Sequence, residues 1–269
     1  MLRSLKDLEG YAVRASDGDV GSVFDFLFDD ERWVVRHLVV DTGSFFKRRH
    51  HVLISPSSFR TTDWATRRFH LALTTDKIQN SPSVDVDQPV SRRHELAHCA
   101  YYGFPYYWGF PGAFAGEVYP SLLAGEARNT VPDATPEDVH LRSTREVRGY
   151  HIQGNDGVIG HVDDLIVEDA TWDVRYLVLD TASWWLGKRV LVSPQWTRRI
   201  SWVEKMVHVD VSRQRIKEAP AWDPSAGVNR EYEARLYDYH GRPAYWNLGA
   251  AMAGPQSQPA TKGVRSDAR

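Results

Sequence analysis

The chain has 269 residues, of which 42% are apolar and 25% charged, a balance that can bury the core of one or two globular domains. Its 33 Lys and Arg residues and 35 Asp and Glu residues leave a net charge of -2, which excludes a whole-molecule positive field for nucleic acid or an anionic membrane. Cys99 is the only cysteine, so an intrachain disulfide and a cysteine-built zinc finger are excluded.

The N-terminal segment MLRSLKDLEG is charged and lacks the apolar core of a signal peptide. No segment approaches the roughly 20 apolar residues that span a bilayer. We therefore expect a cytoplasmic protein.

The first hundred residues predict a small β-domain. Ser16-Asp17-Gly18 is typical of a hairpin turn, with glycine supplying a positive φ. The continuous apolar run from Val34 to Val40 indicates a central strand, and the alternation from Arg68 to Leu73 indicates a strand with one buried face. Several short strands separated by turns favour a small closed or half-closed β-barrel.

Two helical segments follow these strands. Thr74 is placed to cap a short helix, TDKIQN. His94, His98 and Tyr101 then share one helical stripe that ends at Gly103. We expect an amphipathic strap whose aromatic end packs against the barrel.

A second copy of this pattern begins after a segment rich in proline, glycine and alanine. Asp156 repeats Asp17 and Trp172 repeats Trp33, each 139 residues later, and the offset becomes 138 after one loop. Such self-similarity indicates gene duplication. We predict a first repeat over residues 1–109, a linker over 110–140, a second repeat over 141–247 and a disordered tail over 248–269.

The helical segments recur in the second copy. Ser212 precedes RQRIKE, and Tyr232, Leu236 and Tyr239 form the second stripe before Gly241. Both tails share the pattern Y-x-G-x-P-x-Y-W, whose aromatic residues are Tyr101, Tyr107 and Trp108 in the first copy and Tyr239, Tyr245 and Trp246 in the second. A feature present once per repeat favours a structural clamp over a ligand cage. Proline and glycine in the first copy's segment from Ala100 to Phe114, and its lack of Lys and Arg, disfavour a membrane anchor.

Three motifs carry a family resemblance. They are G-Y-x-V-x-x-x-D-G-D-V-G-x-V-x-D-F-L-F-D from Gly10 to Asp29, W-x-V-R-x-L-V-V-D-T-G from Trp33 to Gly43, and V-L-I-S-P from Val52 to Pro56, and they recur from Gly149. The pattern resembles the PRC-barrel family, which includes the cytoplasmic domain of the photosynthetic reaction centre H subunit and the C-terminal domain of the ribosome maturation factor. The resemblance implies six-stranded barrels without a catalytic apparatus, used as adaptors or docking surfaces.

We therefore expect a mainly β chain with two tandem small PRC-like β-barrels, each followed by short helices and an aromatic tail. The chain lacks the H subunit's N-terminal membrane helix and the maturation factor's N-terminal domain, so neither specific role is carried over.

His94-x-x-x-His98-Cys99 has the spacing of two metal ligands on one helix face. Its counterparts in the second copy are Tyr232, Leu236 and Tyr237, and no carboxylate is placed to complete a ligand set. We favour histidines that pack in the strap, and we predict neither a metal nor another cofactor.

Acidic residues recur at equal positions in the two copies and invite a general acid/base interpretation. They are Asp25, Asp29 and Asp41 with Asp164, Glu168 and Asp180. Because a small barrel fills its interior with side chains, we favour turns in which such carboxylates bind local amides. No nucleophile-elbow, P-loop or dinucleotide motif is present, so we predict that the protein is not an enzyme.

The loop FFKRRHH places two rings beside Arg48 and Arg49, and its mate keeps two tryptophans beside Lys188 and Arg189. This composition could contact nucleic acid or lipid headgroups. These four basic residues and the six aromatic residues of the tails form our candidate interaction surface.

We favour a protein-interaction or assembly adaptor with protein partners, a homodimer among them. The alternatives are a photosynthesis-associated or membrane-associated adaptor that resembles the reaction centre H subunit, and an RNA- or ribosome-associated factor that uses the basic loops. Nucleic acid and anionic membrane surfaces are the less favoured partners.

Overall fold

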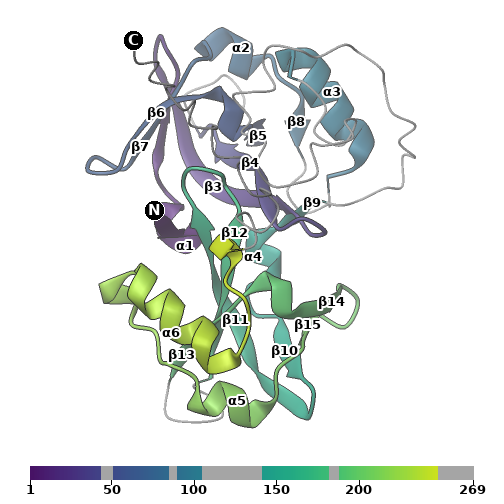
Figure 1. Cartoon of the computed structure of the whole chain (residues 1–269). Coiled ribbons are helices and arrows are strands. Elements are labelled where there is room, and N and C mark those ends of the chain that lie inside the picture. Colours follow the sequence, from purple (N-terminus) through teal and green to yellow (C-terminus); the bar gives the residue numbers. More distant parts are fainter. Residues whose placement is uncertain (44–50, 85–89, 105–140, 182–187, 248–269) are drawn as a thin grey trace, which may run out of the picture.

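The computed structural model describes residues 1–43, 51–84, 90–104, 141–181 and 188–247. Figure 1 shows two β-rich units stacked end to end, one from each repeat. The prediction of a mainly β chain with two units in tandem is confirmed.

The first unit contains eight strands, three α-helices and one 3-10 turn among the described residues. In chain order these are β1 (Leu2–Ser4), α1 (Leu5–Leu8), β2 (Ala12–Arg14), β3 (Asp19–Asp29), β4 (Val34–Asp41), β5 (His51–Ile54), η1 (Pro56–Ser58), β6 (Phe59–Asp63), β7 (Arg68–Leu71), α2 (Thr75–Gln79), β8 (Ser83–Val84) and α3 (Arg92–Tyr102).

The second unit repeats this order within the described part of the chain, without an equivalent of β8. Its elements are β9 (Leu141–Ser143), α4 (Thr144–Val147), β10 (His151–Gly154), β11 (Gly157–Glu168), β12 (Val174–Asp180), β13 (Arg189–Val192), η3 (Pro194–Trp196), β14 (Thr197–Ser201), β15 (Met206–Val209), α5 (Arg213–Glu218), η4 (Pro224–Ala226) and α6 (Arg230–His240).

The two sheets have the same strand order. The first runs β6-β7-β2-β3-β4-β5-β8 and the second runs β14-β15-β10-β11-β12-β13. In each sheet one neighbouring pair is parallel, β2 with β7 and β10 with β15, and the other pairs are antiparallel. Among the described residues no ladder joins the two ends of either path, so neither sheet forms a closed barrel, which was one of the two forms that the sequence predicts.

The units exchange their first strands. β1 of the first repeat pairs with β11 of the second, with Leu2 opposite Glu168, and β9 of the second repeat pairs with β3 of the first, with Leu141 opposite Asp29. β2 is short and covers only the first half of β3 on that side, and β10 likewise covers only the first half of β11. The exchanged strands cover the remaining edges, whose backbone groups would otherwise lack partners.

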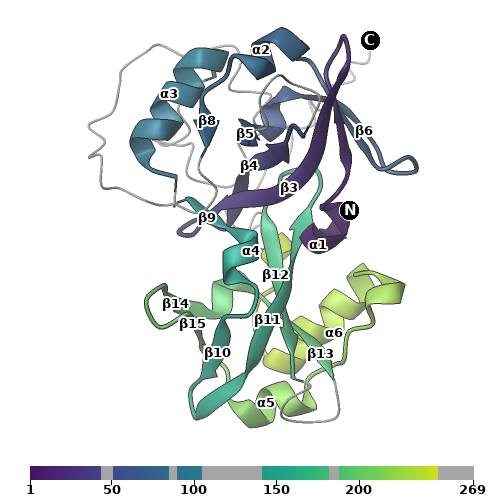
Figure 2. The same cartoon turned by 180° about the vertical axis from the view of Figure 1, so that it is seen from behind.

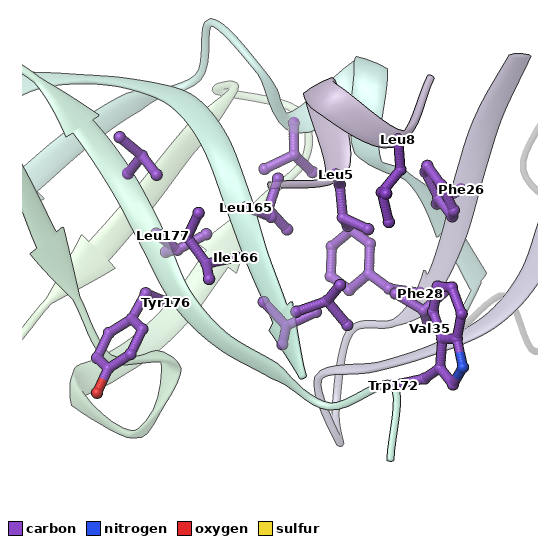
Figure 3. Packing of buried hydrophobic residues seen from close by; sticks show 14 of the residues in the cluster. Leu5, Leu8, Phe26, Phe28, Val35, Leu165, Ile166, Trp172, Tyr176 and Leu177 are labelled. Atoms are coloured by element: carbon purple, nitrogen blue, oxygen red, sulfur yellow. The ribbon is translucent and has the colours of Figure 1, made fainter. Parts of the chain in front are cut away.

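The exchange extends to the helices. Figure 2 shows α1 beside the second unit and β9 beside β3 of the first. Leu5 and Leu8 of α1 are 1% and 2% exposed, and Figure 3 places them between Leu165 of β11 and Phe26 of β3. Burial of one such leucine contributes about 1.5–3 kcal/mol. The two units therefore share one hydrophobic core.

The tips of the two β-hairpins also meet. Trp33 and Trp172 have left-handed φ values of 58° and 64°, which are unfavourable for bulky residues. The β3–β4 and β11–β12 hairpins are joined here by two backbone hydrogen bonds. The Val35 amide donates to the Trp172 carbonyl at 2.8 Å, and the Val174 amide donates to the Trp33 carbonyl at 2.7 Å. The Trp172 ring stacks on Phe26 of the first unit with centroids 6.2 Å apart. These contacts hold the strained backbone.

One glycine of the repeated motif is required by close approach of the chain. A Cβ atom on Gly21 would lie 2.0 Å from the Asp41 carbonyl oxygen, and one on Gly160 would lie 2.3 Å from that of Asp180. The predicted hairpin turns join β2 to β3 and β10 to β11. Gly18 does not have the positive φ that the sequence predicts, whereas Gly157 in the second turn does. The two turns differ in length: four residues lie between β2 and β3, and two lie between β10 and β11.

The helix caps are where the sequence predicts them. Thr74 caps α2 and Ser212 caps α5, each through its hydroxyl. The α6 stripe is confirmed for Tyr232 and Leu236, which are buried. In α3 the buried face is rotated from the predicted stripe, because Tyr101 is exposed and the buried residues are Glu95, His98, Cys99 and Tyr102.

Candidate functional site

The tail of the second repeat packs on the sheet of its own unit. Asn229 caps α6 by accepting from the Tyr232 amide at 2.8 Å, and Gly241 ends the helix in the left-handed region. The Tyr237 ring contacts Trp196 of η3 and Trp246 beyond the helix, with centroids 5.6 and 5.3 Å apart. The arrangement is that of the predicted structural clamp.

A buried glutamate joins this tail to the sheet. Glu233 is 2% exposed and accepts from the hydroxyls of Tyr176 at 2.8 Å and Tyr245 at 3.0 Å. Arg230 lies 3.2 Å from its other oxygen. Burial and this carboxylate raise the pKa of both tyrosines. Tyr245 therefore acts as a donor that fixes the tail, and Arg175 lies over its ring at 4.2 Å.

The equivalent glutamate of the first repeat, Glu95, lies beside histidines. It is 1% exposed and its Oε1 lies 4.0 Å from Nε2 of His37 on β4. The His37 and His98 rings are 4.7 Å apart. Burial lowers the pKa of His98 to about 4 and also lowers the pKa values of His37 and His94, so these rings are neutral near pH 7.

The predicted histidine motif is thus divided by the fold. His98 Nε2 lies 2.9 Å from the Leu53 carbonyl oxygen, which fits a neutral donor ring. Cys99 is buried, and His94 is only half-buried. Among the residues that the structure describes, no group of three His, Cys, Asp or Glu side chains has the geometry to hold a metal ion.

Two of the candidate surface tyrosines have the same local role. The Tyr101 hydroxyl donates to the Lys77 carbonyl of α2 at 2.8 Å, and the Tyr239 hydroxyl donates to the Arg215 carbonyl of α5 at 3.0 Å. Each strap is thereby tied to the preceding short helix of its own unit. Tyr107 and Trp108 lie outside the described residues.

The basic residues of the second loop have partners within the chain. The Lys188 ammonium donates to the Lys217 carbonyl at 2.8 Å and also to the Ala219 carbonyl. Arg189 lies 3.1 Å from Asp163, and 40% of its side chain is exposed. Arg48 and Arg49 of the first loop lie outside the described residues. Lys188 therefore fixes the end of α5, and Arg189 keeps a solvent-facing part.

Two of the acidic residues hold the exchanged elements. Asp25 accepts from the Thr144 hydroxyl at 2.8 Å and from the Arg145 amide at 3.2 Å, both at the start of α4. Asp164 accepts from the Ser4 hydroxyl and, at 3.1 Å, from the Lys6 amide at the start of α1. A β-bulge precedes each of these carboxylates. Burial raises both pKa values, that of Asp164 to about 6.

The other predicted carboxylates have local roles. Asp41 accepts from the Gly43 amide at 2.8 Å, the turn that the sequence predicts. Asp29 accepts from the Glu31 and Arg32 amides, and Glu168 pairs with Arg175. Five of the six predicted acidic residues thus serve turns, a local ion pair or the boundary between the units.

Sequence reasoning missed Glu95 and Glu233 and the reciprocal roles of Asp25 and Asp164. The constant repeat offset relates the members of each pair and is the pattern that could have found them. No helix in the described ranges is long and apolar enough to cross a bilayer.

Comparison with known proteins supports the resemblance seen in the motifs. Residues 141–216, from β9 through most of α5, match the PRC-barrel domain family. A search of curated proteins found no match. Residues 141–216 of the second repeat therefore form a PRC-barrel domain.

Proposed function

We propose that this protein is a non-enzymatic adaptor that assembles other proteins on its paired units. The observation that carries the proposal is the PRC-barrel match over residues 141–216, because that family implies an assembly or interaction role. The core packed against the two sheets also supports the proposal. Phe26, Phe69 and Tyr176 are large, fully buried side chains, and they fill space that a reaction site would need.

The environment of the acidic residues also supports the proposal. Asp25 and Asp164 accept several hydrogen bonds from the elements they hold. A general acid or base must face a substrate site, whereas these two carboxylates face the exchanged elements. Lys188 is occupied with backbone carbonyls, which favours a protein partner over nucleic acid at that loop.

A native complex tests the proposal. Tagged full-length protein is purified from its native lysate, treated with nuclease in the absence of membranes, and run on size exclusion with mass spectrometry of the eluted species. We expect a protein partner in a defined stoichiometry that rebuilds the same complex from purified components. Loss of the complex on nuclease treatment, or retention only on anionic vesicles, would contradict the proposal in favour of an RNA or membrane role.

Charge reversal separates these outcomes further. A variant with Arg48→Glu and Arg49→Glu removes the basic character of the first loop. Its matched control carries Arg60→Glu and Arg68→Glu, two exposed positions on the β6–β7 hairpin. We expect both variants to keep the protein complex, whereas an RNA or lipid contact through the loop would be lost only in the first variant.

A further inference from the structure

A cavity of about 200 Å³ lies at the end of the second unit away from the first. Its lining comes from the β10–β11 turn, the end of β15, α5 and the C-terminal end of α6, elements that lie near one another in Figure 1. The lining residues are Asn155, Asp210, Val211, Ser212, Arg215, His240 and Arg242. The volume exceeds the roughly 30 Å³ share of one water molecule and is below the roughly 300 Å³ of drug-sized pockets. It suits a small ion or a single functional group.

The cavity carries an excess of positive charge. Arg242 donates to the Asp210 carboxylate at 3.1 Å, and Arg198 also contacts this carboxylate at 2.6 Å. Arg215 has no carboxylate partner among the described residues. The lining thus holds two guanidinium groups and one carboxylate, and Arg198 outside the lining adds a further positive charge on that carboxylate. Hydrogen bonds from its neighbours lower the pKa of Asp210 and keep it ionised.

Both lining arginines are held in place and have donors left over. Arg215 donates from one nitrogen to the His240 carbonyl at 3.3 Å and lies 5.4 Å from the Tyr239 ring centroid. The hydrogen bonds of Arg242 likewise use one nitrogen, on the carbonyl and carboxylate of Asp210. Since a guanidinium group has five N–H donors, most donors of both groups remain for a ligand.

A buried ring completes the lining. His240 is 7% exposed and its ring packs at a tilt against Trp196, with centroids 4.5 Å apart. Its Nε2 has no hydrogen-bond partner in the described part of the chain. Burial and the two arginines lower its pKa to about 4, so the ring is neutral at pH 7. A buried polar atom without a partner costs stability unless something binds it.

The first repeat serves as an internal comparison, because it has no such lining. Ala72, Tyr102 and Phe104 occupy the positions of Asp210, His240 and Arg242. The rings of Tyr102 and Phe104 are stacked 5.6 Å apart. Three positions around the cavity thus differ between the repeats: the first has alanine and two aromatic rings, and the second has a carboxylate, an imidazole and a guanidinium group.

We propose that this cavity is a binding site for a small oxyanion, a phosphate or a carboxylate group, held by Arg215 and Arg242 with His240 at its inner wall. Guanidinium groups form strong charge-assisted hydrogen bonds with both kinds of oxyanion. The site does not depend on the adaptor role proposed above.

Calorimetric titration of inorganic phosphate, sulfate and acetate into the full-length protein tests the site. We expect one saturable site for at least one of the three anions. Phosphate and sulfate binding without acetate would assign a tetrahedral oxyanion, and acetate binding would assign a carboxylate. Absence of saturable heat with every anion up to about 10 mM, where a millimolar Kd is detectable, would overturn the proposal.

Two variants and a matched control locate the binding. Arg215→Gln changes an exposed position on α5 and is expected to weaken binding about tenfold or more, with an unchanged circular dichroism spectrum. His240→Tyr restores the residue of the first repeat and is expected to abolish binding. Lys77→Gln alters the position equivalent to Arg215 in the first unit and should leave the affinity unchanged. Equal affinity in all four proteins would overturn the proposal.

Discussion

The equivalent helices α3 and α6 carry different side chains at one fully buried position. His98 lies there on α3, where the second repeat has Leu236 on α6. The groups near the His98 ring are His94 and Tyr102 on its own helix, His37 on β4 and the Leu53 carbonyl on β5. Glu95 and Arg36 lie beside His37. The neutral His98 ring donates to the Leu53 carbonyl.

This burial predicts a loss of stability in acid. The pKa of His98 is about 4 in the folded protein, compared with an ordinary value of 6.5. As the pH falls below 6.5 the unfolded chain takes up a proton that the folded chain does not, so folding stability falls until the pH reaches about 4. Between pH 7 and 5 this one group should cost about 2 kcal/mol.

Urea unfolding of the wild type and of His98→Leu at pH 7 and pH 5 measures this effect. The leucine variant should lose about 2 kcal/mol less than the wild type over this interval. It should also be about 1 kcal/mol less stable at pH 7, because the Leu53 carbonyl loses its donor. His151→Gln, at an exposed position, is the control. Equal losses in the wild type and in His98→Leu would show that His98 does not set the acid response.

At the scale of elements, the exchanged strand and helix at the start of each repeat depend on one buried carboxylate. Asp164 is 5% exposed and receives the start of α1, while Asp25 is 3% exposed and receives the start of α4. Each carboxylate also accepts from the amide of the residue that follows it, at 2.7 Å. Removal of either side chain leaves several donors at the unit boundary without an acceptor.

Asp25→Ala and Asp164→Ala should therefore each lower the free energy of unfolding by about 2 kcal/mol. Urea denaturation followed by tryptophan fluorescence measures the change. Asp19→Ala, where 61% of the side chain is exposed, should stay within about 0.5 kcal/mol of the wild type. If the two buried variants matched this control, the carboxylates would not anchor the exchanged elements.

At the scale of the whole molecule, the two repeats pack into one body with a common core. They exchange β1 and β9, share a hydrophobic core and cross their hairpin tips through Trp33 and Trp172. We therefore expect the two units to stay associated when the backbone between residues 104 and 141 is cut in the folded protein.

A protease site inserted within residues 110–140 tests this. After cleavage of the folded protein, the two fragments should elute together from size exclusion as a 1:1 complex and separate only in denaturant. The uncut protein with the same insertion is the control. Fragments that separate under native conditions would mean that the exchange contributes little to the association.

The duplication, the β-rich class, the helix caps at Thr74 and Ser212 and the turn at Asp41 could all be predicted from the amino-acid pattern, because each depends on residues close together in the chain. The service of Asp25 and Asp164 to the opposite repeat is visible only in the folded chain. The repeat pattern is the same whether a strand pairs within its own unit or with the other.

The same limit applies to the candidate site. The positions that became Asp210, His240 and Arg242 are readable in the sequence as differences between the repeats. Their convergence on one cavity is not, because it depends on how α5, α6 and β15 pack at long range. The rotated face of α3 has a similar origin: the contacts of Glu95 and His98 with β4 and β5 set its orientation, and the helical period alone leaves it open.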